Sequence, residues 1–333
     1  MHSLLRQQAQ RRRRWFLLLT MLLLLSFLLN LSVGQLSLSL NDWLSGLSPL
    51  QQQVLLELRL PRAWLALLLG AGLAVSGCVL QTLLHNPVAD TGLIGVSSGA
   101  SLFAVITLFV ARRLEWLLPP WLLSVAAFAG ALLITLALLG LARRGRLDNA
   151  RLLLLGVAMG ICASAITTWL LYFASDQSMR EIMFWMMGSL AYGQTQPLWW
   201  WLPYLLVLFW LLGQSRQLAL LQLGEYQAQL MGLNLRQVRQ RLVLAVCVLS
   251  GMAVALAGAI GFIGLLVPHL MRQIGRDGPA FVLPASALGG GCLLLWADLL
   301  SRTLLPSGEL PVGVLTASLG APLFIYLLVR RDA

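Results

Sequence analysis

The segment Gly95–Gly99 reads Gly-Val-Ser-Ser-Gly and matches the G-x-S-x-G pattern that exposes a nucleophilic serine in many hydrolases. A serine nucleophile needs an imidazole base, and His85 and His269 are the possible partners of Ser97. The flanking residues, however, predict a membrane loop and an apolar helix instead of a strand and a helix. Small residues at this density more often let helices or a substrate approach closely. An intramembrane serine hydrolase is therefore kept only as an alternative.

Carboxylates within the membrane would indicate a second chemistry, because proton-coupled transporters normally place ionisable residues there. None of the twelve carboxylates lies in the middle of a predicted span. Asp298 comes nearest, at the outer end of its predicted helix and one turn before Arg302. An interfacial i,i+4 contact, worth roughly a few tenths of a kcal/mol, accounts for that pair. A proton-coupled secondary transporter is thus an alternative that lacks its usual coupling residue.

The basic residues exclude two further chemistries. All 23 are Arg, and the chain contains no Lys. A Walker-type phosphate loop and a Schiff base both require Lys, so we expect this chain to contain neither. If ATP drives the function, another chain must bind it.

Composition and cysteine usage define the broad class of protein. Of 333 residues, 59% are apolar and only 11% are charged, whereas about a quarter of a soluble domain is charged. A water-soluble monomer is excluded. The four cysteines fall singly inside apolar runs, without the spacing of a metal site or a disulfide framework. We expect all four to be small core residues: Cys78, Cys162, Cys247 and Cys292.

Ten apolar stretches are candidates to cross a bilayer core, which needs about 20 residues of helix. Eight are clear, and two come from splitting 263–300, where charged residues separate two apolar arms. Residues 181–190 are too short to cross and predict a partial or re-entrant helix. The ten predicted spans are 15–33, 62–84, 93–111, 118–141, 151–174, 197–213, 241–262, 264–275, 280–300 and 311–330.

The distribution of arginines predicts the orientation. The basic start of the first span resembles a signal peptide, but no small-x-small cleavage pattern follows in 30–36, so we expect a retained helix. Ten spans put both termini on one side, and placing them inside leaves 17 arginines in cytoplasmic segments and six outside. This charge lies at helix ends, not along one face with interleaved aromatics, which argues against nucleic-acid binding.

The predicted cytoplasmic loop 214–240 contains a compact amphipathic phrase. Its apolar residues recur every three or four positions and predict one short helix that ends at Gly232. A helix lying on lipid headgroups would carry Arg on its polar face, but this face carries Glu225 and several Gln. We therefore predict that the helix docks a partner protein. Its apolar stripe consists of Leu220, Leu223, Tyr226, Leu230 and Leu233.

Two other patterns stand out near the predicted span ends and interiors. Arg59 and Arg62 bracket Leu60-Pro61, and Arg302 precedes Pro306 and Glu309. Interfacial anchoring would explain these outer arginines, although the inside bias suggests an additional role. Glycine-rich stretches predict helix-packing seams, and the phrase Ala257–Gly264 before Pro268 also predicts a broken helix of the kind that lines a transport path. The stretches are Gly70–Gly77, Gly156–Gly160, Gly258–Gly264 and Gly289–Gly291.

Five phrases in fixed order give the chain a family resemblance. It is similar to the membrane permeases of ATP-driven importers for iron chelates, haem and cobalamin, from Trp15 to Val329. Among these it most resembles the vitamin B12 permeases, in Tyr172-Phe173, in Phe184–Gly188 and in the final helix. The phrases are Arg59–Arg62, Gln81–Gly95 (QTLLHNPVADTGLIG), Leu223–Gly232, Gly258–Arg272 (GAIGFIGLLVPHLMR) and Glu309–Pro322 (ELPVGVLTASLGAP).

The resemblance implies an all-α polytopic fold, with about ten transmembrane helices per subunit plus short re-entrant and coupling helices in a single domain, 1–333. It implies a homodimer in the lipid of the bacterial inner membrane, with both termini cytoplasmic and the translocation path at the dimer interface. Two copies of a separate ATPase, which bind ATP and Mg, would dock on 214–240, and a periplasmic binding protein would deliver the substrate. This chain would then hold no cofactor and catalyse no covalent step. Cobalamin is the expected substrate, with haem or a ferric siderophore as alternatives.

The resemblance also implies roles for particular residues. In the vitamin B12 permeases, arginines at the positions of Arg59, Arg62 and Arg302 receive acidic residues of the binding protein. Small hydroxyl residues form an inner gate at the positions of Asp148, Asn149 and Ala150, from which this chain departs. The ATPase-docking residues would be Leu223, Gly224, Glu225, Ala228 and Gly232.

Overall fold

The computed structural model is entirely helical, apart from turns and loops, over the residues that it describes: 2–34, 36, 38, 42, 44, 46–144, 149–193, 200–275, 278–305 and 308–329. The elements are α1 (His2–Ser32), α3 (Pro49–Gln53), the π-helix η1 (Val54–Arg59), α4 (Leu60–Leu83), α5 (Val96–Arg113), α6 (Pro120–Arg144), α7 (Asn149–Tyr172), α8 (Asp176–Met186), the 3₁₀-helix η2 (Leu190–Gly193), α9 (Trp201–Leu212), α10 (Ser215–Gln222), α11 (Glu225–Leu230), α12 (Leu235–Ala257), α13 (Ile263–Gly275), α14 (Pro279–Thr303) and α15 (Val312–Val329).

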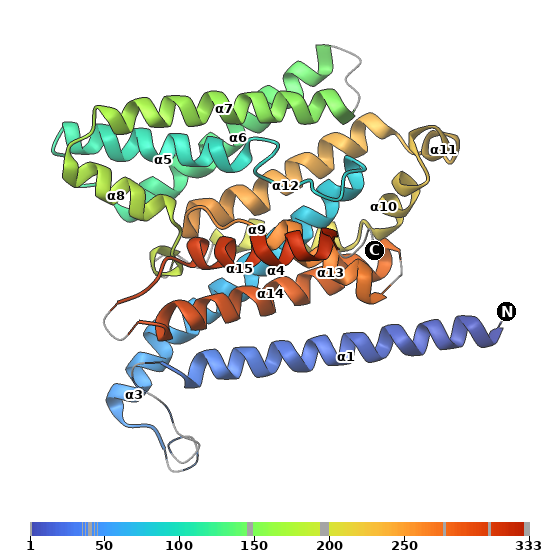
Figure 1. Ribbon diagram of the computed structural model, residues 1–333, viewed down its shortest axis with the longest axis horizontal. Coiled ribbons are helices and arrows are strands. Elements are labelled where there is room, and N and C mark those ends of the chain that lie inside the picture. Colours follow the sequence, from blue (N-terminus) through green and yellow to red (C-terminus); the bar gives the residue numbers. More distant parts are fainter. Residues whose placement is uncertain are drawn as a thin grey trace.

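The helices form two groups joined by α12. On one side α5 packs against α6 and α7, and on the other α4 packs against α13 and α14, with α1 on the outer flank (Figure 1). Figure 1 places α3, α8 and the last turn of α14 at one end, which we call the α3 end. It places α10, α11 and the first turn of α1 at the other, which we call the α11 end.

Each of the ten predicted spans overlaps a helix, and the polytopic character is confirmed. Seven helices among the described residues are long and apolar enough to cross a membrane, or eight if the bent pair α9 and α10 counts as one span. The other two helices are shorter, since α13 has 13 residues and α15 is apolar over Val312–Leu327. The number of crossings therefore stays a prediction.

A continuous helical run of 35 residues, Pro49–Leu83, forms the centre of the molecule. It begins at a capping box, in which the Ser48 hydroxyl accepts from the Gln51 amide and the Gln51 side chain accepts from the Ser48 amide. Pro61 lies in the first turn of α4, directly after the π-helix η1, so it falls inside this run and not at its start. Almost all of α4 after this turn is buried, because α12, α13 and α14 surround it.

The predicted glycine seams are confirmed where the central helices cross. A Cβ added at Gly70 would overlap the backbone of Gly290, and one added at Gly77 would overlap the backbone of Gly264. These pairs let α4 contact α14 and α13 backbone to backbone. Gly156 serves the same purpose for α7, against the turn that precedes α5.

The predicted helix break before Pro268 is also confirmed. α12 ends at Ala257, and Gly258 and Phe262 both have positive φ angles, of 71° and 68°. The Ala257 carbonyl, freed at the end of α12, accepts a 2.8 Å hydrogen bond from the amide of Ser189. The break is thus tied to the segment that follows α8.

The short helix predicted over 181–190 exists but lies earlier in the chain. α8 begins after Ser175, whose hydroxyl accepts from the Ser178 amide and caps the helix. It ends at Met186, just before Gly188 takes a φ of 76°. With 11 residues, or about 16 Å, α8 does not cross a bilayer. A polar cap, not the apolar pattern, sets its start.

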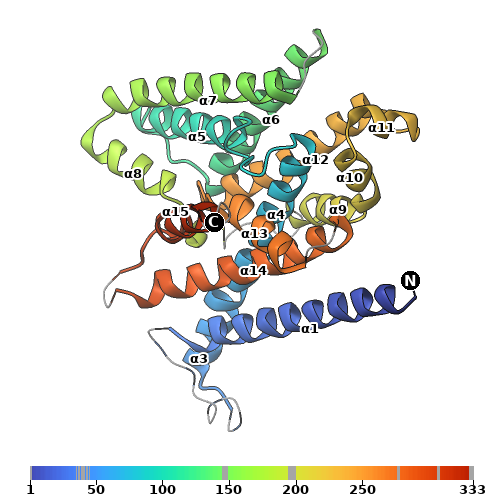
Figure 2. The ribbon, with the colours of Figure 1, turned by 45° about the vertical axis from the view of Figure 1, so that its right-hand side comes forward.

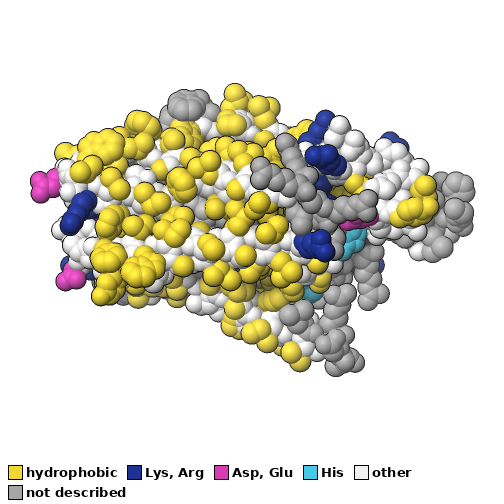
Figure 3. Space-filling view, turned by 90° about the horizontal axis from the view of Figure 1, so that it is seen from above, with side chains coloured by type: hydrophobic (Ala, Val, Ile, Leu, Met, Phe, Trp, Pro, Cys, Tyr) yellow, Lys and Arg dark blue, Asp and Glu magenta, His cyan; other side chains and the backbone are white. Residues whose placement is uncertain are grey.

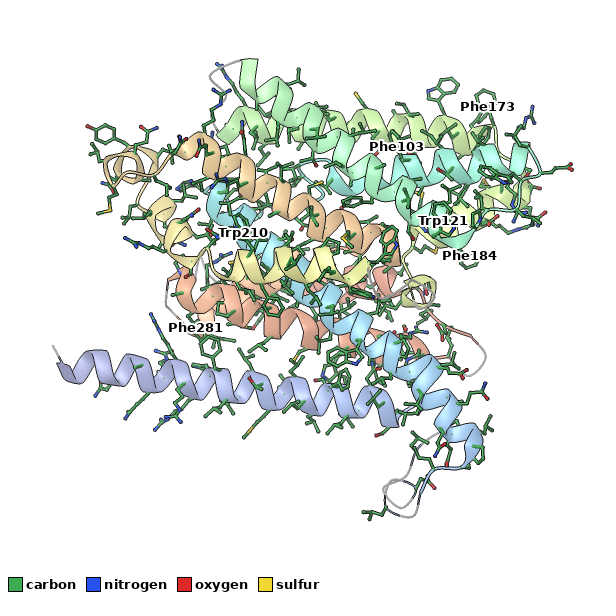
Figure 4. All side chains as sticks on the ribbon, turned by 180° about the vertical axis from the view of Figure 1, so that it is seen from behind. Phe103, Trp121, Phe173, Phe184, Trp210 and Phe281 are labelled. Carbon is green, nitrogen blue, oxygen red and sulfur yellow. The ribbon has the colours of Figure 1, made fainter. Side chains whose placement is uncertain are left out.

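The outer surface of the bundle is largely apolar. In Figure 3 hydrophobic side chains cover the flank of the molecule, while charged side chains gather toward its two ends. α1 and α7 leave most of their apolar segments exposed. Figure 2 shows α1 on the rim of the molecule, and Phe281 of α14 reaches it through a ring contact with Phe16, with centroids 5.1 Å apart (Figure 4). This is the surface expected of a protein that meets lipid.

The cysteines correct one prediction. Cys78, Cys247 and Cys292 are buried, as expected of small core residues. Cys162 is exposed on α7, so its assignment to the core of this chain is wrong. Cys162 belongs to an apolar run, but that run lies on the outer helix, where hydropathy alone does not separate core from surface.

Candidate functional site

Three arginines meet at the α3 end. Arg59 closes η1, Arg62 lies in the first turn of α4, and Arg302 lies in the last turn of α14. Arg59 and Arg62 are three residues apart on one continuous helical run, so they share a face. Together with Glu309 the three arginines line a cavity of about 400 Å³. The structure thus brings together residues that the sequence separates by more than 200 positions.

Asp298 is the buried centre of this cluster. Its Oδ1 lies 2.6 Å from Nε of Arg62, and its Oδ2 lies 3.1 Å from Nε of Arg302. Asn30 of α1 donates from Nδ2 to Asp298 Oδ2 at 3.1 Å and accepts from Arg302 Nη2 at 2.9 Å. The predicted i,i+4 pair exists, but the description of it as interfacial is wrong, because the Asp298 side chain is fully buried and also holds Arg62.

The other two contacts of the cluster lie nearer its surface. Arg62 Nη1 donates to both oxygens of Glu309, at 3.0 and 2.8 Å. Arg59 donates to the backbone carbonyls of Leu31 and Ser32, which end α1, and to the carbonyl of Leu36 beyond it. Glu309 and Asn30 were not predicted as members. The sequence signal for Glu309 is a carboxylate directly before the last predicted span. The signal for Asn30 is a polar amide inside an otherwise apolar helix.

The arginines are more enclosed than an outer docking role suggested. Arg59 and Arg62 are each only 5% exposed, and their guanidinium groups are engaged within the chain. Access runs through the cavity, and two donors of the cluster are buried without a hydrogen-bond partner among the described residues: Nη2 of Arg62 and Nε of Arg302. The cluster therefore presents positive charge as a pocket, not as protruding side chains.

The predicted coupling helix at the α11 end is divided in two. α10 ends before Gly224, which has a φ of 102°, and α11 spans only Glu225–Leu230 before Gly232 turns the chain with a φ of 85°. A single stripe from Leu220 to Leu233 is therefore wrong. Both turns use a backbone conformation that favours glycine. The three- and four-residue spacing of the apolar residues continues across both turns, so the spacing alone does not reveal where the helix is interrupted.

The exposed face of this region differs in part from the prediction. Ala228 is fully buried within the chain, so it cannot contact a partner, and its assignment to the docking surface is wrong. Glu225 is half-exposed and pairs with Arg239 of α12 at 2.7 Å, which ties α11 to a long helix. The large exposed apolar side chains of the region are Leu223, Tyr226, Leu230 and Met231, which we call the α11 face.

The α11 face is joined to the central helices by a set of polar contacts. The His85 ring contacts the Leu221 carbonyl at 2.9 Å, which links the end of α4 to α10. Gln81 donates to the carbonyls of Gly264 and Leu265 and accepts from Arg272, so the same end of α4 holds α13. The end of α4 therefore contacts α10 through His85 and α13 through Gln81.

The predicted inner gate falls mostly outside the described residues. Asp148 lies outside them, and the same holds for the side chain of Asn149, which begins α7. Ala150 is exposed in the first turn of α7. The gate assignment stays a prediction.

The serine pattern at Gly95–Gly99 occupies a helix start. The preceding residues form turns, Gly95 caps α5 with a φ of 78°, and a Cβ at Gly99 would overlap Ile134 and the backbone of Gly130. A nucleophile elbow follows a strand, and none precedes this segment in the described part of the chain. Close packing of α5 on α6 accounts for the small residues.

An aromatic surface lies on the exposed side of α7. Ala165, Thr168, Trp169 and Tyr172 line an open cavity of about 540 Å³. Phe173 extends this surface at the α3 end, stacked on Trp169 with centroids 5.9 Å apart (Figure 4). Within the described residues, no three His, Cys, Asp or Glu side chains are grouped so that they could hold a metal ion. The surface suits a large ligand or a second protein chain.

These features together define a polytopic membrane transport protein. They are the apolar helices in two packed groups, the charged clusters at both ends and the broken helix between α12 and α13. The sequence profile of the FecCD transport family matches residues 22–330, and the chain belongs to this family.

Relatives of known description cover nearly the whole chain. The vitamin B12 import system permease protein BtuC of Serratia proteamaculans is 47% identical over 305 residues, which are 92% of this chain and 89% of the relative. The protein of the same description from Shigella boydii is 45% identical over 330 residues, or 99% of both chains. A solved structure described as an inward-facing conformation of a metal-chelate type ABC transporter has a TM-score of 0.85 and 31% identity, and the match covers 96% of this chain and 99% of that one.

Proposed function

We propose that this chain is the membrane-spanning subunit of an ATP-driven importer that carries cobalamin from the periplasm to the cytoplasm across a bacterial inner membrane. The observation that carries the proposal is 45–47% identity, over more than nine tenths of the chain, to permeases described as vitamin B12 import proteins. The five sequence phrases fall on the α3 end, the α11 end and the broken helix, which are the places where such a subunit would meet its partners.

The energy source belongs to another chain in this proposal. Because the sequence lacks Lys, a Walker-type site has no place here, and ATP and Mg would bind a separate ATPase. The α11 face supports its docking, since four large apolar side chains stand exposed beside the ion pair of Glu225 with Arg239. Two copies of the ATPase would serve two copies of this chain.

The α3 end would face the periplasm and the α11 end the cytoplasm. The arginine bias supports this orientation, with both termini inside. At the α3 end a binding protein would dock with acidic side chains directed into the cavity of Arg59, Arg62 and Arg302. Alternating access would follow, with ATP hydrolysis on the partner biasing outward- and inward-facing states.

The translocation path would lie between two copies of the chain, along the aromatic surface of α7. Trp169 and Tyr172 offer flat apolar faces and two polar tips, which suits a bulky, partly apolar metal chelate. Haem and ferric siderophores share this general chemistry, and the solved structure of similar fold is described only as a metal-chelate transporter. Haem and ferric siderophores are therefore the alternative substrates that the uptake experiment below must distinguish from cobalamin.

Uptake into proteoliposomes tests the proposal. The permease would be reconstituted with its ATPase and supplied with the binding protein, labelled cobalamin and ATP. We expect ATP-dependent accumulation that excess unlabelled cobalamin suppresses and that survives collapse of the proton gradient. If haem or a ferric siderophore suppressed the uptake and unlabelled cobalamin did not, that compound would replace cobalamin as the proposed substrate. If uptake stopped when only the proton gradient was collapsed, ATP-driven import would be rejected. A Ser97→Ala variant that transports normally would reject a role for that serine.

A further inference from the structure

Arg62 makes two ion pairs that differ in how easily they can be broken. Its Nε contacts Asp298 at 2.6 Å, where both side chains are buried. Its Nη1 contacts Glu309, whose side chain is 45% exposed at the mouth of the cavity. A buried ion pair is lost only at high cost, whereas a half-exposed carboxylate can leave for water at little cost. The contact with Glu309 is thus the one that an incoming ligand can replace.

The charge of the pocket identifies the ligand that would replace it. Three arginines face two carboxylates, so the cluster keeps one net positive charge while Glu309 is in place and two when it leaves. Nη2 of Arg62 is also buried without a hydrogen-bond partner among the described residues. A guanidinium with two free nitrogens binds a carboxylate with two parallel hydrogen bonds. The pocket therefore fits a second carboxylate in the place of Glu309.

The backbone beside Glu309 allows this exchange. The Leu310 amide donates to the Ser301 carbonyl of α14 at 3.0 Å, which holds the segment in place. Only the Glu309 side chain has to rotate toward solvent, where nearly half of it already lies. No helix needs to move before a ligand can enter.

We propose that Glu309 is an internal carboxylate that occupies Arg62 until an acidic side chain of the binding protein displaces it. This rests on the proposed function, in which that protein docks at the α3 end. Docking is then an exchange of one carboxylate for another, so Glu309 weakens the complex and favours release of the binding protein after delivery. A carboxylate that only positions Arg62 would have the opposite effect on docking.

The test compares Glu309→Gln with a charge-matched control. Glu57→Gln also removes one carboxylate charge, from the helical run that carries Arg59 and Arg62, but Glu57 accepts from Gln53 at 3.1 Å and does not line the cavity. The complete importer would be placed in nanodiscs, and the Kd of the cobalamin-binding protein of the same bacterium would be measured. We expect Glu309→Gln to bind it about two- to fivefold more tightly, the equivalent of one half-exposed ion pair, and Glu57→Gln to match the wild type. Glu309→Ala, which also removes the remaining hydrogen bonds, should bind at least as tightly as Glu309→Gln.

The outcomes separate this inference from its premise. Arg302→Gln should weaken docking, since it removes one positive charge from the pocket. If Arg302→Gln binds the protein like the wild type while it still elutes as a monodisperse complex, the docking assignment fails and the inference with it. If Arg302→Gln is weaker but Glu309→Gln is unchanged or weaker, only the inference is overturned. If Glu57→Gln lowered the Kd of the binding protein as much as Glu309→Gln does, the inference would also be overturned. The loss of one negative charge anywhere near the pocket would then explain the tighter binding.

Discussion

Asp298 shows how one carboxylate can hold three helices. It binds Arg62 of α4 and Asn30 of α1 while it lies on α14, and Arg302 closes the network from its own helix. Two guanidinium groups taken out of water are tolerated only while a negative charge sits between them. The stability of the α3 end therefore depends on this side chain more than on any exposed ion pair.

Asp298→Asn should destabilise the protein by about 3 kcal/mol or more, because two buried arginines lose their counter-charge. Glu181→Gln is the matched control: it removes the exposed pair of Arg112 with Glu181, worth about 0–1 kcal/mol. The measurement is the temperature at which half of the detergent-solubilised protein leaves the monodisperse elution peak. Similar losses for both variants would contradict the assignment of Asp298 as the buried centre.

We expect the stability of the folded protein to depend on pH through Asp90, which lies in the turn after α4. Burial raises the pKa of its carboxyl group above the usual range, although hydrogen bonds from Thr91 oppose the shift. A carboxyl group with a raised pKa in the folded state favours folding at low pH, and that contribution is lost as the pH rises through the raised pKa. Asp90→Asn should therefore be more stable than the wild type at neutral pH.

The stability difference between Asp90→Asn and the wild type should shrink as the pH falls toward about 4, where both side chains are neutral. Thermal elution profiles at several pH values measure it. Glu115→Gln, at an exposed position on the α5 to α6 loop, serves as the control for the loss of one carboxylate. A constant difference for Asp90→Asn at every pH would rule out titration of Asp90 as the cause.

At the scale of elements, the crossing of α4 with α13 depends on two glycines. Gly77→Ala would place a methyl group into the Gly264 backbone, which cannot retreat as a side chain can, and should cost at least about 1–3 kcal/mol. Gly140→Ala is the control, since nothing lies within 4 Å of its added Cβ and alanine favours a helix by about 1 kcal/mol. Thermal stability should fall for the first and hold or rise for the second. Equal effects would argue against the backbone contact.

The α11 face should carry the affinity for the ATPase. Tyr226→Asp or Leu230→Asp should reduce copurification of the ATPase at least about tenfold, because each places a charge in an apolar contact. Gln237→Asp, an exposed change nearby on α12, should leave copurification intact. Ala228→Arg should lower the yield of folded permease instead, since Ala228 is buried. Normal copurification with Tyr226→Asp and Leu230→Asp would remove the α11 face from the interface.

The sequence predicts helices well and their contacts poorly, for a physical reason. Hydropathy and length locate every long helix because the bilayer imposes both. The partners of Asp298 depend on side chains 236 residues away in Arg62 and 268 residues away in Asn30, which no local pattern encodes. The burial of Ala228 likewise follows from how α11 folds against α12 after two glycine turns. Residue types predict candidate groups, but tertiary packing decides how exposed those groups are.

At the scale of the whole molecule, the orientation can be tested directly. In a variant without native cysteines, which must include replacement of the exposed Cys162, Glu115→Cys should react with an impermeant thiol reagent in spheroplasts. Gln229→Cys on α11 should react only after permeabilisation. Both positions are exposed, so accessibility on the protein does not limit either reaction. Labelling of Gln229→Cys in intact spheroplasts would invert the topology and place the α11 face outside, where no ATPase is available.

The helical run through α4 is a mechanical lever as well as a core element. Arg62 near one end and Gln81 near the other are 19 residues apart, or about 29 Å along the axis. After Pro61 the helix contains no proline, and three neighbouring helices pack against it, so a tilt at one end would be carried along its whole length. A tilt of about 5° around one end would displace the other by about 2.5 Å, roughly half a helical turn. A tilt imposed at the arginine pocket would thereby reach the contacts of Gln81 with α13, at the other end of α4.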